Sequence, residues 1–157
     1  MIRLSPARAV VYGTLVVGIL DATDALIFFG LKGATPTRIF QSIASGLLGR
    51  AAFSGGLRTA LLGVALHFLI AFLIVSTFLV ASRYIRVLRR APVWSGLIYG
   101  VAVYLVMNFV VVPLSAAGRG PLSWPVVVNG VLIHMLGVGL VTSLFVRAAQ
   151  ESNHSSD

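Results

Sequence analysis

Residues 18–29 read GILDATDALIFF and place two aspartates, Asp21 and Asp24, inside a run that is otherwise apolar. Hydrocarbon is a costly place for a carboxylate, so each of these side chains needs a partner, a proton or an aqueous pocket. The stretch therefore predicts a membrane-spanning helix and also marks a candidate functional site.

The composition of the whole chain agrees with a membrane location. Of 157 residues, 58% are hydrophobic and 10% are charged, and the mean hydropathy is +0.99. A soluble domain cannot hide so much apolar surface, so we expect an integral membrane protein whose main partner is the lipid bilayer. The chain has no cysteine, which excludes disulfides and thiolate metal sites.

The net charge of +8 comes from 12 basic and 4 acidic residues. The basic side chains fall in the short connections between apolar runs, a pattern typical of membrane anchoring and orientation. We therefore expect no nucleic-acid partner.

Four apolar runs are long enough to cross a bilayer core of about 30 Å, which takes roughly 20 helical residues. They cover residues 9–31, 59–81, 94–116 and 125–147. Backbone groups in lipid must be bonded internally, and none of the runs alternates as a barrel strand would. The sequence predicts an all-α polytopic membrane protein, a four-transmembrane-helix bundle in a single domain over residues 1–150, followed by a disordered polar tail at 151–157.

The connection between the first two runs contains a further predicted helix, at residues 36–50. Thr35 is a good N-cap, and Pro36 suits the first helical position. Apolar residues then recur at helical spacing, with polar residues on the other side. We expect an amphipathic helix that lies at the membrane interface or, alternatively, covers a cavity as a lid.

The distribution of basic residues predicts the orientation. Arg83, Arg86, Arg89 and Arg90 form the strongest orientation signal, because no acidic residue accompanies them. Four spans place both termini and this connection on one side, with seven basic residues there against five on the other. We predict that both termini are cytoplasmic.

The third run carries features of close helix packing. Gly96 and Gly100 have the spacing of small residues at transmembrane interfaces, and Tyr104 and Asn108 continue the same stripe. Pro113 is expected to bend or end this helix.

Polar side chains in all four runs fall at similar depth. Counted from the centres of the runs, Asp21, Asp24, His67, Asn108 and His134 lie about 1 to 6 Å from the midplane at about 1.5 Å per residue. Small residues flank them, which lets the helices approach. One polar site at the centre of the bundle is the simplest interpretation, and Tyr104 is expected to line the same cavity.

Several kinds of chemistry fit this polar cluster. Asp21, Asp24, His67 and His134 could bind a divalent metal such as zinc, iron or manganese, with Asn108 as orienter. The same groups could relay protons, because two close carboxylates do not ionise easily together. Haem is disfavoured by the adjacent carboxylates and the narrow core. Finally, the polar groups could simply bond to one another and fix the register of the helices.

Catalytic motifs are missing from the sequence. His67 is followed by Phe68, Leu69, Ile70 and Ala71, so it starts no HExxH or HxxxH motif, and neither a nucleophile elbow nor a phosphate-binding loop is present. We therefore expect no enzymatic activity.

Three stretches carry a resemblance to known proteins: IFQSIASGLLGRAAF at 39–53, ALHFLIAF at 65–72 and YGVAVYLVMNFVVVPLSA at 99–116. Over residues 13–116 the chain resembles a group of small bacterial four-helix inner-membrane proteins of unassigned activity. The resemblance implies four helices and a location in the bacterial inner membrane, and it transfers no activity and no site residues.

The sequence leads to two functional hypotheses. In the first, the polar cluster binds a cation or relays protons, in a protein that forms a homo-oligomer because four helices rarely make a complete transport path. In the second, the protein is a non-catalytic membrane scaffold or assembly factor, and the cluster only holds the helices together.

Overall fold

The computed structural model describes residues 4–118 and 123–150, and every regular element in these two segments is helical. Four helical runs are long and apolar enough to cross a membrane, and their bounds differ from the predicted ones by only a few residues. The helical fold of the described residues and the presence of four helical runs of membrane-spanning length are thus confirmed. The runs are Pro6–Gly30, Gly56–Tyr84, Pro92–Leu114 and Trp124–Gln150. Arg3, Arg119 and the predicted tail at 151–157 lie outside the described residues.

Two of the runs are single α-helices, and the other two change their winding along the way. The first run is α1 (Pro6–Gly30) and the second is α3 (Gly56–Tyr84). The third comprises α5 (Pro92–Val106), the π-helical η2 (Met107–Val111) and α6 (Val112–Leu114). The fourth comprises α7 (Trp124–Ile133), the π-helical η3 (His134–Leu140) and α8 (Val141–Gln150).

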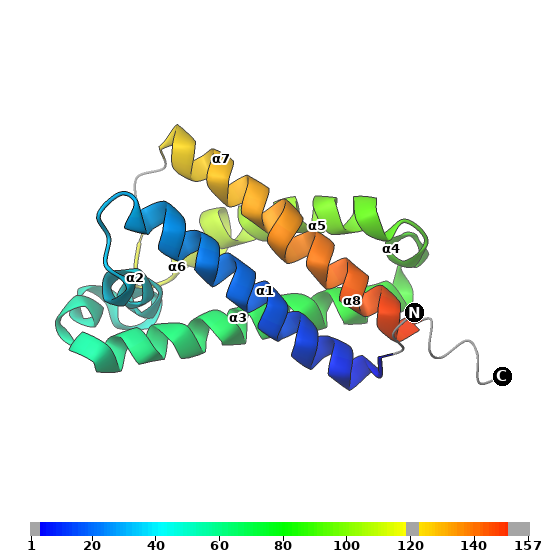
Figure 1. Ribbon diagram of the computed structural model, residues 1–157, viewed down its shortest axis with the longest axis horizontal. Helices are drawn as coiled ribbons and strands as arrows, with labels where there is room; N and C mark the ends of the chain where they lie inside the picture. The colour runs from blue at the N-terminus through cyan, green and yellow to red at the C-terminus, as the bar shows by residue number, and fades with distance from the viewer. Residues whose placement is uncertain (1–3, 119–122, 151–157) are drawn as a thin grey trace.

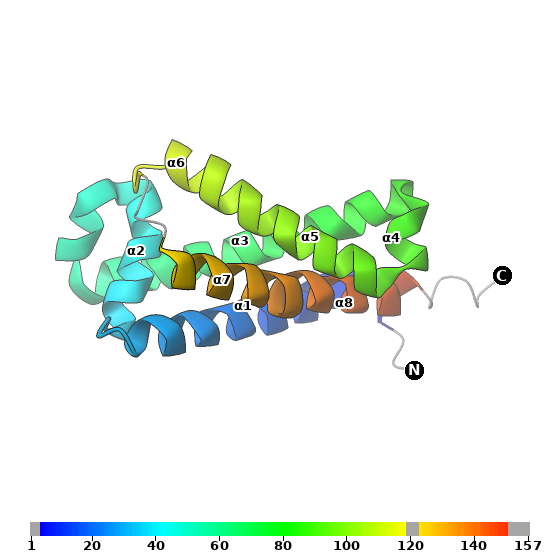
Figure 2. The ribbon, with the colours of Figure 1, turned by 90° about the horizontal axis from the view of Figure 1, so that it is seen from above.

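Shorter helices occupy the two ends of the bundle. α2 (Pro36–Leu48) and the 3₁₀ turn η1 (Gly49–Ser54) connect α1 to α3, and α4 (Arg86–Arg90) connects α3 to α5. In Figures 1 and 2, α2 lies crosswise at one end of the bundle. The start of α1, the end of α8 and α4 lie together at the other end, as an even number of spans requires. We call these the α2 end and the α4 end.

Local sequence explains where α1 and α2 begin. The Ser5 hydroxyl accepts the Arg8 N–H at 3.3 Å, and Thr35 does the same for Arg38 at 3.3 Å. A proline follows each cap, where its missing N–H costs no helical hydrogen bond. The helix expected from Thr35 onward is therefore present, ending at Leu48 rather than at residue 50.

α2 is tied firmly to its neighbours. Gly63 of α3 lies directly against the Phe40 carbonyl, where a Cβ would collide with backbone. The Gln41 amide donates to the Gly56 carbonyl at 3.0 Å and to the Thr59 hydroxyl at 3.3 Å. The Ala116 N–H donates to the Gly46 carbonyl at 2.9 Å. α2 is thus held in place against the start of α3 and against residue 116.

Replacing Gln41 with leucine is expected to lower stability by about 1 to 3 kcal/mol, because Gln41 is only 4% exposed and its amide makes two hydrogen bonds that tie α2 to the start of α3. Thermal unfolding followed by circular dichroism in mild detergent measures the effect. Thr37→Leu, on the exposed side of the same helix, is the matched control. Equal melting temperatures for both variants would show that Gln41 does not hold α2 in place.

The tightly packed core lies toward the α4 end. One cluster joins all four spans through Val17, Ala71, Val75, Val103 and Val138, and a second adds Phe78, Leu79 and Val146. Toward the α2 end, α5 and α6 draw away from α7, as Figure 2 shows. The two apolar clusters thus close the centre and the α4 end of the bundle, together with the buried hydroxyl side chains of Ser82, Thr142 and Ser143, and the α2 end has room for a site.

The π-helical segments lie in the third and fourth spans. In η2 the Val112 N–H donates to the Met107 carbonyl, five residues back. Pro113 follows at once, and because its ring clashes with the carbonyl four residues back, a wider turn relieves the conflict. The helix ends at Leu114, as expected of a span that meets Pro113. Such π turns are frequent at functional sites.

Candidate functional site

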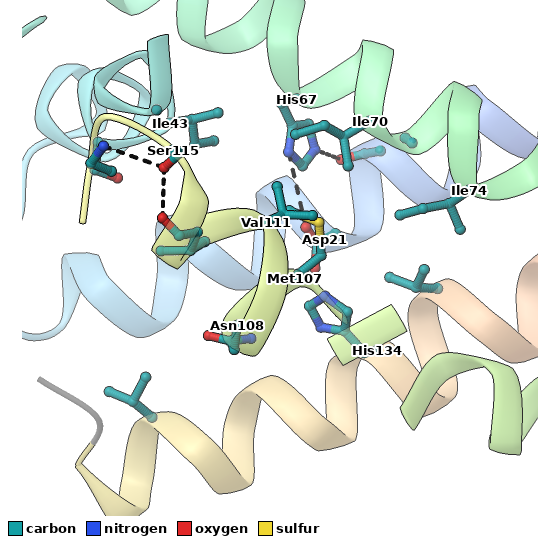
Figure 3. A pocket seen from close by; sticks show the side chains of 18 of the residues that line it. Asp21, Ile43, His67, Ile70, Ile74, Met107, Asn108, Val111, Ser115 and His134 are labelled. Carbon is teal, nitrogen blue, oxygen red and sulfur yellow. Dashed lines mark hydrogen bonds and ion pairs between the residues drawn. The ribbon is translucent and has the colours of Figure 1, made fainter. Parts of the chain in front are cut away.

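A cavity of about 910 Å³ opens between the four spans in the half of the bundle toward the α2 end. Residues of α1, α2, α3, η2, α6, α7 and η3 line it, so it belongs to the whole bundle rather than to one pair of helices. The order of the lining residues along the antiparallel helices divides the cavity into three layers. From the α4 side to the α2 side we call them the floor, the polar band and the rim. Figure 3 shows this region.

The floor faces the α4 end and is apolar. It is made by Val17, Ala71, Ile74 and Val138, three of which belong to the central core cluster. Val17 is 1% exposed and Val138 is 2% exposed. The cavity therefore stops at a packed core and does not continue through the bundle.

The polar band comes next and contains Asp21, His67, Asn108 and His134. Each comes from a different span, as the depth count in the sequence suggested. The rim lies nearest the α2 end and includes Lys32, Ser42, Ser115 and Ser123. The Lys32 ammonium sits 3.8 Å over the Phe28 ring.

Asp21 and His67 form the central contact of the polar band. The Nε2 atom of His67 lies 2.8 Å from the Gly18 carbonyl oxygen, which can only accept, so this nitrogen carries a hydrogen and donates it. The Nδ1 atom lies 4.0 Å from Oδ2 of Asp21. The His67 side chain is 11% exposed and that of Asp21 is 26% exposed. Nδ1 is therefore the nitrogen left to exchange a proton.

Gly18 makes the contact between α1 and α3 possible. A Cβ at this position would lie 2.5 Å from Cε1 of Phe68, so no larger residue fits without a shift. Phe68 follows His67 directly, and its ring contacts the imidazole edge-on at a centroid distance of 5.4 Å. The close approach of the two helices thus brings the Gly18 carbonyl to His67.

His134 presents its other nitrogen to the cavity. Its Nδ1–H donates to the Gly130 carbonyl at 2.8 Å, one turn earlier in the same helix, which leaves Nε2 as an acceptor. Tyr104 packs edge-on against the ring at 5.5 Å and is 5% exposed. Tyr104 does not line the cavity, contrary to expectation, because it fills the space beside Gly130 behind His134.

Asn108 lies in η2 and also lines the cavity. Its amide donates to the Tyr104 carbonyl at 3.0 Å, one turn earlier in its own helix. The Asn108 side chain thus stabilises the backbone at the junction of α5 with the π-helical turn.

Asp24 is separated from the band. Its Oδ2 accepts a hydrogen bond of 2.7 Å from the Asn129 amide in α7, and neither residue lines the cavity. Asn129 was missed from the sequence, although it is a polar residue inside the fourth apolar run and could have been counted with the others. The expectation that both aspartates share one site needs correction, because α7 offers Asp24 its own partner.

The predicted metal site is not assembled. Within residues 4–118 and 123–150, no group of three or more histidine, cysteine or acidic side chains is placed to hold a metal ion. Asp24 is hydrogen-bonded to Asn129, and one ring nitrogen of His67 and one of His134 are hydrogen-bonded to backbone carbonyls. The charged groups do not form a buried cluster either, since Asp21 is a quarter exposed. What the helices bring together is Asp21, His67, Asn108 and His134 around a cavity.

Figure 3 shows how these side chains lie. In that view Asp21 is seen between the rings of His67 and His134, with Met107 beside it and Asn108 farther along the same helical segment as Met107. Asp21, His67 and His134 all line this cavity, and Nδ1 of His67 and Nε2 of His134 are the ring nitrogens that no backbone carbonyl occupies.

No model of a protein family matches the chain, and neither a curated protein nor a solved structure is significantly similar to it. The resemblance to small bacterial inner-membrane proteins stays a prediction.

Proposed function

We propose that this chain binds a proton or a small cation at the Asp21–His67 pair, within a membrane cavity that is open at the α2 end, and serves in transport. The observation that carries the proposal is the orientation of His67: Nε2–H is committed to Gly18, and Nδ1 faces Asp21 at 4.0 Å. In this proposal the polar band is the cation site, with Asp21 as its charged group.

The electrostatics of the pair favour one bound proton. With a neutral ring, the lone pair of Nδ1 would face a carboxylate. A proton on Nδ1 turns this into an ion pair, whose attraction at 4 Å is about 4 kcal/mol at an effective dielectric constant of 20, before desolvation is counted. Among the described residues, the other ionisable groups that line the cavity are His134 and Lys32, and Lys32 lies at the rim.

The sealed floor determines what kind of transport is consistent with this site. A continuous proton wire would have to pass the packed apolar side chains of Val17 and Val138 before it reached the buried hydroxyls of Thr14 and Thr142 on the α4 side. Access from the α2 end alone fits a protein that loads its site from one side and changes shape to unload. The π-helical turns beside Asn108 and His134 are where such a change can occur with least loss of packing.

Nitrogen NMR of the histidines tests the proposal. In ¹⁵N-histidine-labelled protein, the ring-nitrogen signals of His67 report whether Nδ1 carries a proton that faces Asp21 at 4.0 Å, as the proposal expects. In Asp21→Asn, we expect the neutral ring with the hydrogen on Nε2, because the balancing carboxylate is gone. Single-histidine variants assign the signals.

Asp24→Asn is the matched control, because it removes a carboxylate one turn away on the same helix that bonds Asn129 outside the cavity. It should leave the His67 signals unchanged. A neutral His67 in the wild type, with no change in Asp21→Asn, would overturn the proposal.

The scaffold alternative has its own support. The Asp24–Asn129 bond ties α1 to α7, and the His67–Gly18 bond ties α1 to α3. If these bonds are the whole purpose of the polar groups, Asp21→Asn changes neither the protonation of His67 nor any binding property, and at most lowers the melting temperature.

We further propose that the chain lies in a bacterial cytoplasmic membrane, with both termini in the cytoplasm and α2 at the opposite interface. We also propose that it forms a homo-oligomer. Arg86, Arg89 and Arg90 of α4 support this orientation, since they lie at the same end of the bundle as the start of α1.

A further inference from the structure

We propose that the cavity takes an organic primary ammonium ion, with its –NH₃⁺ group in the polar band and its apolar body between the band and the rim. This inference deepens the proposed cation site and rests on it. It names the class of ligand that the donors, acceptors and walls of the cavity fit.

The first step is the balance of donors and acceptors in the band. His67 has used its hydrogen on the Gly18 carbonyl, and His134 has used its hydrogen on the Gly130 carbonyl. Together with the Asp21 carboxylate, the nitrogens that remain are acceptors. A primary ammonium carries N–H donors and no acceptor, so it can donate both to the Asp21 carboxylate and to Nδ1 of His67, which lie 4.0 Å apart.

The second step is the size and character of the walls. A cavity of about 910 Å³ lies at the upper end of the range for organic ligands, which is roughly 300–1,000 Å³. Between the band and the rim the lining includes Ile43, Val111 and Val112. A bare metal ion would leave this surface unused, whereas an alkyl or aryl group would cover it. The described residues also lack a group of three metal-binding side chains.

The third step is the sign of the ligand's charge. A lipid with an anionic headgroup would have to place its headgroup at Lys32 on the rim and its acyl chain over Asp21 and the histidines. The carboxylate would then be covered by methylene groups without a hydrogen bond, which is costly. A cation instead lies against Asp21, at the depth where the acceptors converge.

The ammonium and the proton compete for the same acceptors. When the ammonium donates to His67 Nδ1, the proton held there leaves and returns to solvent through the open α2 end. Binding at pH 6.5 should therefore release up to one proton per ligand. The same exchange would couple uptake of the ligand to movement of a proton.

The experiment uses the full chain in nanodiscs of phosphatidylcholine, with empty nanodiscs as background, and isothermal titration calorimetry with 2-(1-naphthyl)ethylammonium. The amine is charged at pH 6.5, since simple amines have pKa values near that of lysine, about 10.4. The matched neutral probe is 2-(1-naphthyl)ethanol. The N,N,N-trimethyl derivative keeps the charge and removes the N–H donors.

We expect the primary ammonium to bind roughly 10- to 100-fold more tightly than the alcohol, in line with hydrogen bonds to charged groups. The trimethyl derivative should lose most of this gain. Asp21→Asn should lower the affinity for the ammonium to that for the alcohol, and Asp24→Asn should leave the affinity for the ammonium unchanged. Titrations in buffers of different ionisation enthalpy should reveal the released proton.

The wild-type series decides the matter even if Asp21→Asn does not fold. Equal affinity for the ammonium and the alcohol, or no binding of the ammonium, overturns the ligand class. If His67 is protonated in the wild type and loses that proton in Asp21→Asn, the proposed cation site stands on its own. If the histidine signals also fail to respond, both proposals fall together.

Discussion

The variant Gly100→Val is expected to lose the folded bundle, with a destabilisation of more than about 3 kcal/mol. Gly100 lies on α5 directly against the backbone of η3, and a Cβ there would overlap the His134 carbonyl oxygen. A backbone group cannot turn aside as a side chain can, so the two helices must separate. Native proteins have only about 5–15 kcal/mol of stability in total, so we expect little folded protein.

The Gly100→Val result is measured as the yield of monodisperse protein after detergent extraction and as the melting temperature of any fraction that folds. Gly30→Val is the matched control, because Gly30 closes α1 and a Cβ there would have nothing within 4 Å. Gly100→Ala should fall between the two. Normal yield and melting temperature for Gly100→Val would show that α5 and η3 do not pack as described.

The contact at Gly100 also links packing to function. It fixes the backbone of His134, whose ring contributes an acceptor to the polar band, and Gly139 packs against Gly96 and Gly100 in the same way one to two turns farther on. A small-residue interface therefore sets the position of the fourth wall of the cavity. Loss of this interface should move the site even where the bundle survives.

Much of the fold could be predicted from the sequence, for simple physical reasons. The length of each apolar run is set by the thickness of the bilayer, and prolines after Ser5 and Thr35 mark where two helices begin. The π-helical turns could not be predicted, because they change the hydrogen-bond pattern while leaving the apolar composition the same. Pro113 predicted an end to the helix but not the wider turn before it.

The candidate site could be predicted only in part. Depth along the helices predicted that Asp21, His67, Asn108 and His134 lie at one level, since helical rise is nearly constant, and all four line the same cavity. It could not separate Asp21 from Asp24, because residues three apart share a broad face of a helix, and neighbouring helices decide which of them meets a partner. The sequence likewise could not predict which ring nitrogen of His67 or His134 is hydrogen-bonded, because this depends on which backbone carbonyl the fold brings near.

Access to the polar band from one side only is the second result with a large expected effect. The chain has no cysteine, so a single introduced cysteine reports without background. Asn108→Cys places a thiol in the polar band and leaves Asp21, His67 and His134 unchanged. Thr37→Cys on α2 and Val87→Cys on α4 are both exposed and identify which compartment faces each end. Val75→Cys, at a position 0% exposed, reports on the sealed core.

The most direct test of the account is the reaction of these variants with a membrane-impermeant, cationic methanethiosulfonate, in vesicles of both orientations. The account predicts that Asn108→Cys reacts only from the side that labels Thr37→Cys, that an excess of the naphthylethylammonium probe slows the reaction, and that Val75→Cys reacts from neither side. Labelling of Asn108→Cys from the Val87→Cys side, or from neither side, would contradict a cavity that is open at the α2 end and closed by the core.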